Sequence, residues 1–103
     1  MVGEIFLAKI YFTDLKDFKI RPVLVIKEIE DDVICLAIST KFKEGRIIIT
    51  NNDLEDGYLK VNSVVIVPKN FTLSKTILFK KIAKLKKEKF KEIVNIFCNE
   101  ICN

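Results

Sequence analysis

The clearest pattern in the chain is a pair of short apolar runs on either side of an acidic stretch. Residues 21–28 (RPVLVIKE) and 33–40 (VICLAIST) flank residues 29–32 (IEDD). Both runs are rich in β-branched residues, and neither is long enough to make a convincing helix. The pattern therefore predicts a β-hairpin of two buried strands.

This predicted hairpin brings Arg21 close to a hydroxyl group. In antiparallel strands joined by a short loop, the first residue of one strand lies opposite the last residue of the other. A four-residue loop at 29–32 pairs Arg21 with Thr40, whereas a five-residue loop pairs it with Ser39. Pro22 is tolerated at the start of a strand and favours an extended Arg21. We therefore expect a cation beside one or two hydroxyls at the rim of the sheet.

The remaining pattern predicts short strands followed by one helix. Further strands are expected at residues 3–11, 46–50, 61–67 and 76–85, with Pro68 ending the third of these. Loops are expected at residues 12–20, 41–45, 51–60 and 69–75. Apolar residues recur at helical spacing through residues 87–101, which predicts an amphipathic helix. The predicted fold class is mainly β (α+β), a small SH3-like barrel of five to seven strands with a C-terminal helix.

Composition is typical of one folded domain, which we expect to span residues 1–103. Half of the residues are hydrophobic and 31% are charged, a balance that favours a packed core over disorder. The three cysteines are an odd number without framework spacing, and the N-terminal residues do not resemble a signal peptide. No apolar run is long enough to span a bilayer. We therefore expect a cytoplasmic protein with reduced thiols.

Charge is distributed unevenly along the chain. The net charge is +4, but residues 75–91 contain eight lysines and only one acid, Glu88. This segment carries +7 and leaves −3 for the rest of the chain. Such a block is either a solvated face of the protein or an attractive surface for a polyanion such as a nucleic acid.

The side chains available for chemistry are few. The chain has no histidine, which excludes histidine acid–base catalysis and Cys–His nucleophiles. It has no glycine-rich phosphate loop, and Cys98 and Cys102, four residues apart, would make a poor zinc site by themselves. No metal or cofactor is expected. Arg21 with Ser39 and Thr40 remains, and this set suits a phosphate, because arginine binds phosphate in bidentate fashion and hydroxyls can donate to its other oxygens.

Candidate contacts to a nucleic acid lie near the predicted hairpin and on the last strand. Aromatic rings in the 12–20 loop offer base stacking, although they would equally well pack at the edge of the core, and lysines offer phosphate contacts. The candidates are Phe12, Thr13, Phe18, Lys19, Lys41, Lys80, Lys81 and Lys84.

Several segments together resemble the MazF/PemK family in order and spacing. They are residues 3–6 (GEIF), 12–15 (FTDL), 21–26 (RPVLVI), 37–40 (AIST), 63–65 (SVV) and 80–85 (KKIAKL), the last followed by the predicted helix. The loop between the first two strands is shorter than in many members. The resemblance covers nearly the whole chain.

The resemblance implies a toxin of a type II toxin–antitoxin pair, usually a homodimer. The implied activity is metal-independent cleavage of single-stranded RNA, in which the 2′-hydroxyl attacks the adjacent phosphate. Arg21 matches the family's catalytic arginine, and Ser39 matches its catalytic threonine, with Thr40 adjacent. The implied protein partner is an acidic antitoxin whose extended tail occupies the RNA groove.

Two other classes of function fit the same residues. A barrel with a basic strand and exposed aromatics can bind single-stranded nucleic acid without cutting it. A plain protein-interaction module would use its lysines and acidic turns only for solubility. Incubation with mixed single-stranded RNA in EDTA separates an enzyme from a binder, since only the enzyme yields discrete fragments.

Overall fold

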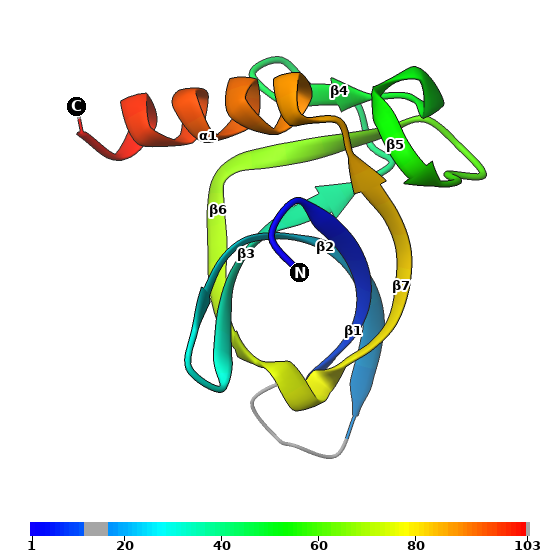
Figure 1. Cartoon of the computed structure of the whole chain (residues 1–103), viewed down its shortest axis with the longest axis vertical. Helices are drawn as coiled ribbons and strands as arrows, with labels where there is room; N and C mark the ends of the chain where they lie inside the picture. The colour runs from blue at the N-terminus through cyan, green and yellow to red at the C-terminus, as the bar shows by residue number, and fades with distance from the viewer. Residues whose placement is uncertain (12–16, 103) are drawn as a thin grey trace.

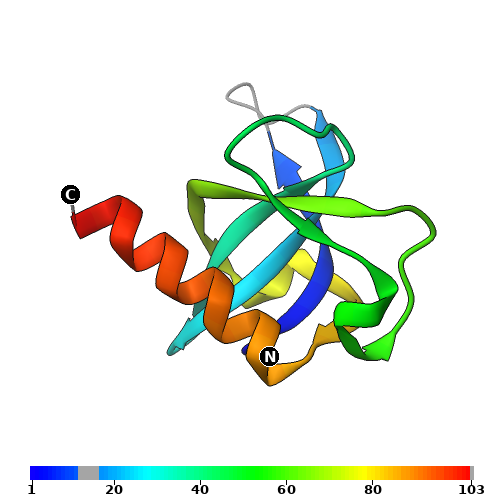
Figure 2. The same ribbon diagram turned by 90° about the horizontal axis from the view of Figure 1, so that it is seen from above.

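The computed structural model of the chain describes residues 1–11 and 17–102, except for the side chain of Pro68. These described residues form seven strands and one long helix (Figures 1 and 2). In chain order the elements are β1 (Glu4–Tyr11), β2 (Phe18–Ile29), β3 (Asp32–Ser39), β4 (Ile47–Ile49), the 3-10 turn η1 (Asn51–Asp53), β5 (Leu54–Gly57), β6 (Ser63–Ser74), the 3-10 turn η2 (Lys75–Ile77), β7 (Leu78–Leu85) and α1 (Lys87–Cys102). No helix in the described part is long and apolar enough to cross a membrane.

All seven strands belong to one antiparallel sheet, in the order β4-β6-β3-β2-β1-β7-β5. The five central strands curl into a ring, which Figure 1 shows end-on. The chain itself completes this ring, because β6 leads directly through η2 into β7. The predicted fold class, a small barrel with a C-terminal helix, is confirmed.

The central hairpin of β2 and β3 is tighter than either loop length considered from the sequence. Ile29 pairs with Asp32, so the turn consists of Glu30 and Asp31 alone. Glu30 has a φ of 53°, the left-handed conformation that tight hairpin turns require. A bulge then shifts the register by one residue between Val25 and Lys27. The predicted hairpin is confirmed, with its ladder in two segments of different register.

Pro68 does not end a strand, which corrects the prediction for this part of the chain. Strand β6 continues to Ser74 and therefore includes residues 69–74, which were expected to form a loop. Leu36 pairs with Asn70, whereas the next residue, Ala37, pairs with Ile66, so residues 67–69 bulge out of the ladder. A proline cannot donate a ladder hydrogen bond but is tolerated at a bulge. Pro68 thus bends β6 without terminating it.

Two further loop predictions were too long. Residues 18–20 belong to β2, and the predicted loop at 51–60 contains η1 and β5. Asn51 orders this second segment, since its side chain bonds both the N–H and the C=O of Leu59 at 2.8 and 3.0 Å. Gly57, at φ 85°, allows β5 to approach β7 closely, because a Cβ here would collide with the carbonyl oxygen of Ile82. The turn-forming residues of this segment therefore predicted a loop where the structure has a short strand.

Side chains on alternate sides of the central strands fill two separate cores. Leu24 of β2 and Leu36 of β3 join the larger core, which α1 covers with Ile93, Phe90 and Phe97. Their neighbours on the other side of the sheet fill a smaller core inside the ring, formed by Ala8, Val23, Val25, Val33 and Cys35. The hairpin strands therefore have both faces covered along their middle.

Cysteine reactivity tests this two-core arrangement. Cys35 is fully buried in the smaller core, and burial raises the pKa of its thiol to about 12, whereas Cys98 and Cys102 are exposed on α1. We expect two of the three thiols to react promptly with a thiol reagent at pH 8, and the third only after denaturation. The Cys35→Ser variant should keep two prompt thiols. If all three thiols of the folded wild type react promptly, the burial of Cys35 in the smaller core is contradicted.

Candidate functional site

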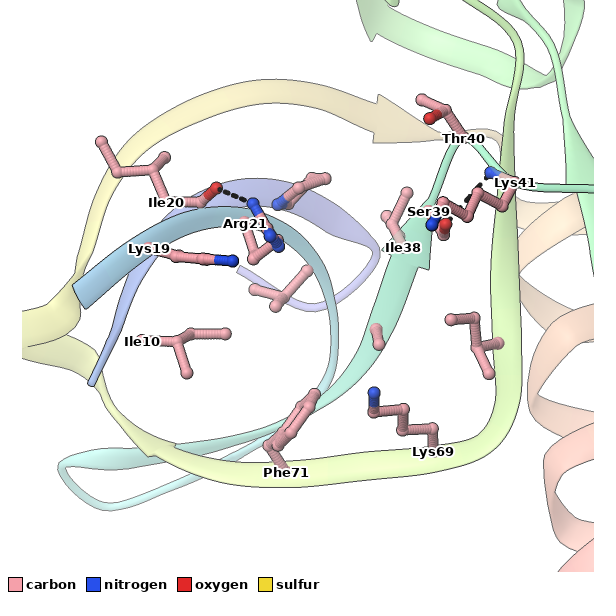
Figure 3. Close-up of a pocket in the computed structure, with 14 residues that line it drawn as sticks. Ile10, Lys19, Ile20, Arg21, Ile38, Ser39, Thr40, Lys41, Lys69 and Phe71 are labelled. Atoms are coloured by element: carbon pink, nitrogen blue, oxygen red, sulfur yellow. Dashed lines mark hydrogen bonds between the residues drawn. The ribbon is translucent and has the colours of Figure 1, made fainter. Parts of the chain in front are cut away.

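A groove of about 700 Å³ opens at one end of the ring, beside the smaller core (Figure 3). Strands β1, β2, β3 and β6 supply its walls, together with the two residues that follow β3. Most of its lining is apolar, formed by Ile10, Ile20, Pro22, Val23, Ala37, Ile38, Ile66 and Phe71. Because Val23 also belongs to the smaller core, the groove rests on rigidly packed structure.

Four cations line this apolar groove, and no carboxylate is among the described lining residues. The cations are Lys19, Arg21, Lys41 and Lys69. A cluster of one sign next to low-dielectric walls attracts the opposite charge and raises its local concentration. The groove is therefore electrostatically suited to an anion with several charges.

Arg21 presents most of its hydrogen-bonding capacity to this groove. It lies in the extended part of β2, opposite Ala8 of β1, and is exposed. Its Nη1 donates to the carbonyl oxygen of Ile20 at 3.3 Å. A guanidinium has five N–H donors in a planar fork, and the others have no hydrogen-bond partner within the described residues. They remain available for a bidentate contact with an oxyanion.

The register of the hairpin determines which hydroxyl faces Arg21. The pairs next to the turn, such as Lys27 with Ile34, would place Thr40 opposite Arg21 if continued. Beyond the bulge Val23 pairs with Ala37, and this register, continued by two residues, places Ser39 opposite Arg21. The β2–β3 pairs end at Val23 and Ala37, so Arg21 and Ser39 are not themselves a ladder pair, and Arg21, Ser39 and Thr40 all line the groove.

Ser39 is the last residue of β3 and is half-buried, whereas Thr40 lies beyond the strand and is exposed. The Ser39 hydroxyl oxygen accepts a hydrogen bond from the backbone N–H of Lys41 at 3.0 Å (Figure 3). Arg46 supports the same turn, since its Nη1 donates to the carbonyl oxygen of Lys41 at 2.9 Å. The Ser39 oxygen is thus held in place while its own O–H stays available to donate.

The three lysines predicted on the last strand lie outside this groove. Lys80, Lys81 and Lys84 belong to β7, which does not contribute to the groove lining. Lys81 bridges two carboxylates, Glu4 at 2.8 Å and Asp56 at 3.4 Å. Lys84 pairs with Glu55 at 3.4 Å, whereas Lys80 forms no such pair within the described residues. Acids from β1 and β5 therefore offset much of the basic charge of β7.

The predicted contacts near the hairpin fall into three groups. Lys19 and Lys41 line the groove beside Arg21. Phe18 lies on β2 but does not line it, and its exposed ring packs near Tyr11 instead. Phe12 and Thr13 lie outside the described residues.

Lys69 was not predicted from the sequence. It lies in the β6 bulge and lines the groove, with its Nζ 6.0 Å from the ring centroid of Phe71. The available signal was Pro68, because a proline inside an apolar run is typical of a bulge. A lysine directly after this proline is then expected to lie in the bulge, outside the regular ladder of the sheet.

The fold and the site define a small curled barrel with a groove that four cations line, without a carboxylate among the described lining residues. The described residues contain no group of three or more potential metal ligands. The family model for PemK-like, MazF-like toxins of type II toxin–antitoxin systems matches residues 1–100. The chain therefore belongs to this family, as its sequence segments predicted, and an antitoxin is its implied partner. No curated protein matches the chain.

The carboxylate at the centre of the β7 ion pairs should make stability depend on pH. The Lys81 ammonium lowers the pKa of Glu4 below its usual 4.5. A carboxyl with a lowered pKa stabilises the folded state above pH 4.5, and this contribution disappears as the pH falls through the lowered value. We expect Glu4→Gln to lower the Tm at pH 7, by an amount that shrinks as the pH falls below 4.5.

Thermal melts between pH 7 and pH 3 measure this difference. Glu100→Gln, which alters an exposed acid on α1, is the matched control and should leave the Tm unchanged. A Tm difference for Glu4→Gln that stays constant over this range would contradict the ion-pair interpretation.

Proposed function

We propose that this toxin is an endoribonuclease that cleaves single-stranded RNA in the groove, without a metal ion, in the cytoplasm. The supporting observation is that Arg21 and Ser39 line the same groove at the open end of the ring, together with Lys19, Lys41 and Lys69. Membership of the toxin family gives independent support. The homodimer implied by the family resemblance stays a prediction.

The groove suits unpaired RNA better than a duplex. Its volume of about 700 Å³ lies within the roughly 300–1,000 Å³ of pockets that enclose a drug-sized ligand. That space accommodates a short stretch of single strand with its bases turned out of the stack. Apolar lining residues such as Phe71 can contact a base, while the four cations reach the phosphates.

In the proposed reaction the RNA 2′-oxygen attacks the adjacent phosphorus and the bond from phosphorus to the 5′-oxygen breaks. The products are a 2′,3′-cyclic phosphate and a 5′-hydroxyl end. Arginine stays protonated in proteins, so Arg21 acts as a charge stabiliser and as a hydrogen-bond donor toward the leaving oxygen rather than as a base. Ser39 donates its O–H to a phosphate oxygen. Water takes up the proton of the 2′-hydroxyl and returns one to the leaving 5′-oxygen.

The same groove provides a mechanism for inhibition. Carboxylates of an extended acidic segment can replace RNA phosphates beside Lys41, Lys69 and Arg21, because cations and no acids are found among the described lining residues. We propose that the antitoxin uses such a segment. RNA and the antitoxin would then exclude each other from the groove of the toxin.

Removal of Arg21 should abolish activity without unfolding the protein. Arg21 is exposed and donates one hydrogen bond within the described structure, so Arg21→Ala should change the free energy of unfolding by no more than about 0.5 kcal/mol. Loss of a transition-state donor should slow cleavage by about 10²-fold or more. The assay is cleavage of mixed single-stranded RNA in EDTA, together with a thermal melt of each variant.

Two further variants assign the hydroxyl in the same assay. Ser39→Ala should reduce kcat, whereas Thr40→Ala should reduce it much less, because β3 and the Lys41 N–H hold the Ser39 hydroxyl in place while Thr40 lies beyond the strand. Wild-type cleavage by Arg21→Ala would overturn the catalytic proposal. A mobility shift without cleavage by the wild type would favour a non-catalytic RNA-binding barrel instead.

Salt dependence should show which lysines contact RNA phosphates. Each lost contact to a single strand flattens the slope of log affinity against log salt by up to about 0.7. We expect Lys19→Gln, Lys41→Gln and Lys69→Gln each to flatten the slope. The prediction for Lys80, Lys81 and Lys84 is tested by the corresponding variants, and an unchanged slope for all three would make β7 a solvated face. An unchanged slope for the groove variants would contradict the proposed site.

A further inference from the structure

A cluster of aromatic side chains lies on the outer face of the same strands that wall the groove. Ile10 of β1 and Lys19 of β2 pair across the ladder and line the groove. The next pair toward the strand ends is Tyr11 with Phe18. Because successive side chains of a strand alternate between its faces, Tyr11 and Phe18 lie on the side opposite the groove, as does Lys9.

These residues form a compact surface around one cation. The ring centroids of Tyr11 and Phe18 are 5.6 Å apart at an interplanar angle of 52°. The Lys9 Nζ lies 5.3 Å from the centroid of Phe18 and 5.7 Å from that of Phe79 at the start of β7. Lys9 forms no salt bridge with a described carboxylate. We call Lys9, Tyr11, Phe18 and Phe79 the outer aromatic platform.

The three rings are largely exposed, at 49% for Tyr11, 44% for Phe18 and 46% for Phe79. A single exposed apolar side chain is common, but several gathered in one place usually mark a binding surface. Packing in the two cores does not require this arrangement, since none of the three rings belongs to either cluster. The platform is therefore a candidate binding surface.

We propose that the outer aromatic platform stacks the bases of RNA nucleotides that flank the segment in the groove. This inference rests on the proposed function, because it extends the path of the same RNA strand. Exposed rings next to a lysine are what non-specific single-strand binding uses, since rings stack on any base and the cation attracts the phosphates.

The platform is continuous with the groove across the rim of the sheet. Lys19 lies in the groove and its neighbour in sequence, Phe18, lies on the platform, so one residue of β2 separates the two surfaces. An RNA strand that leaves the groove past Lys19 meets Phe18 next. A protein partner fits this surface less well, because the cation lies between two of the rings and interrupts the apolar area.

Binding of RNAs of two lengths tests the proposal. Both carry 2′-O-methyl groups, which prevent cleavage; one fills only the groove and the other extends beyond it on both sides. Phe79→Ala should weaken binding of the long RNA by about fivefold or more, as expected for loss of one stacked base, and leave the short RNA unaffected. Tyr58→Ala, which removes a ring that is 66% exposed elsewhere, is the matched control and should affect neither.

Abasic nucleotides distinguish stacking from phosphate contacts. A long RNA with abasic flanks keeps its phosphates but has no flanking bases to stack. The wild type should bind it about as weakly as Phe79→Ala binds the intact long RNA, and Phe79→Ala should lose nothing further. Additive losses would show that the ring does not stack on those bases.

The proposal is wrong if Phe79→Ala weakens binding of both RNA lengths equally, or of neither. It is also wrong if Phe79→Ala sediments as a smaller oligomer than the wild type, or if it loses antitoxin binding while its RNA binding stays intact. Because the RNA analogues cannot be cut, this result does not depend on catalysis. If the wild type cuts no RNA but the length-dependent loss is found, the catalytic proposal fails and the platform stands.

Discussion

The ladder between β2 and β3 positions the groove, and its register depends on one bulge near Ile26. The two-residue turn at Glu30 and Asp31 alone would align Arg21 with Thr40, beyond the end of β3. The bulge displaces the ladder by one residue, and this register, if continued beyond Val23 and Ala37, points from Arg21 toward Ser39, which β3 still holds. The backbone pairing thus limits which hydroxyl of β3 lies nearest to the level of Arg21 on β2.

For binding an anion, the position of the basic residues in the folded chain matters more than their number in one segment of the sequence. Residues 75–91 are the most basic part of the sequence, yet Lys75, Lys81, Lys84 and Lys89 all form ion pairs with acids. The four cations of the groove come from three separate parts of the chain and have no carboxylate among their described neighbours in the lining. The described lining of the groove therefore carries positive charge alone, whereas acids offset much of the charge of β7. A count of charges along the sequence could not show this.

Much of the fold could be predicted from the sequence, because period-two and helical patterns in apolar residues report directly on burial. The strands at the centre of the sheet and α1 were predicted in this way. Strand β5 was missed because only Leu54 is buried among turn-forming residues, and Pro68 was taken as an end where it marks a bulge. These errors share a cause, since local residue preferences were overridden by pairing with distant strands.

The candidate site was predictable only where it depends on the hairpin. Arg21, Ser39 and Thr40 could be brought together by counting residues across a turn. Pro68 signals the bulge that contains Lys69, but only the structure shows that this bulge, in a strand that pairs from the far side of β3, brings Lys69 to the groove. The choice between Ser39 and Thr40 also required the structure, because a bulge in a regular apolar run has no sequence signal of its own.

The two cores on opposite faces of one hairpin have a consequence for how the chain can change over evolution. Consecutive residues along the middle of β2 and β3 enter different cores. Inserting or deleting one residue would therefore exchange the side chains that face the two cores and move the groove residues to the wrong face of the sheet. Length variation should therefore be confined to the connections outside this hairpin. Members of the family would then be free to differ in their peripheral loops while keeping the interval from the arginine to the serine unchanged.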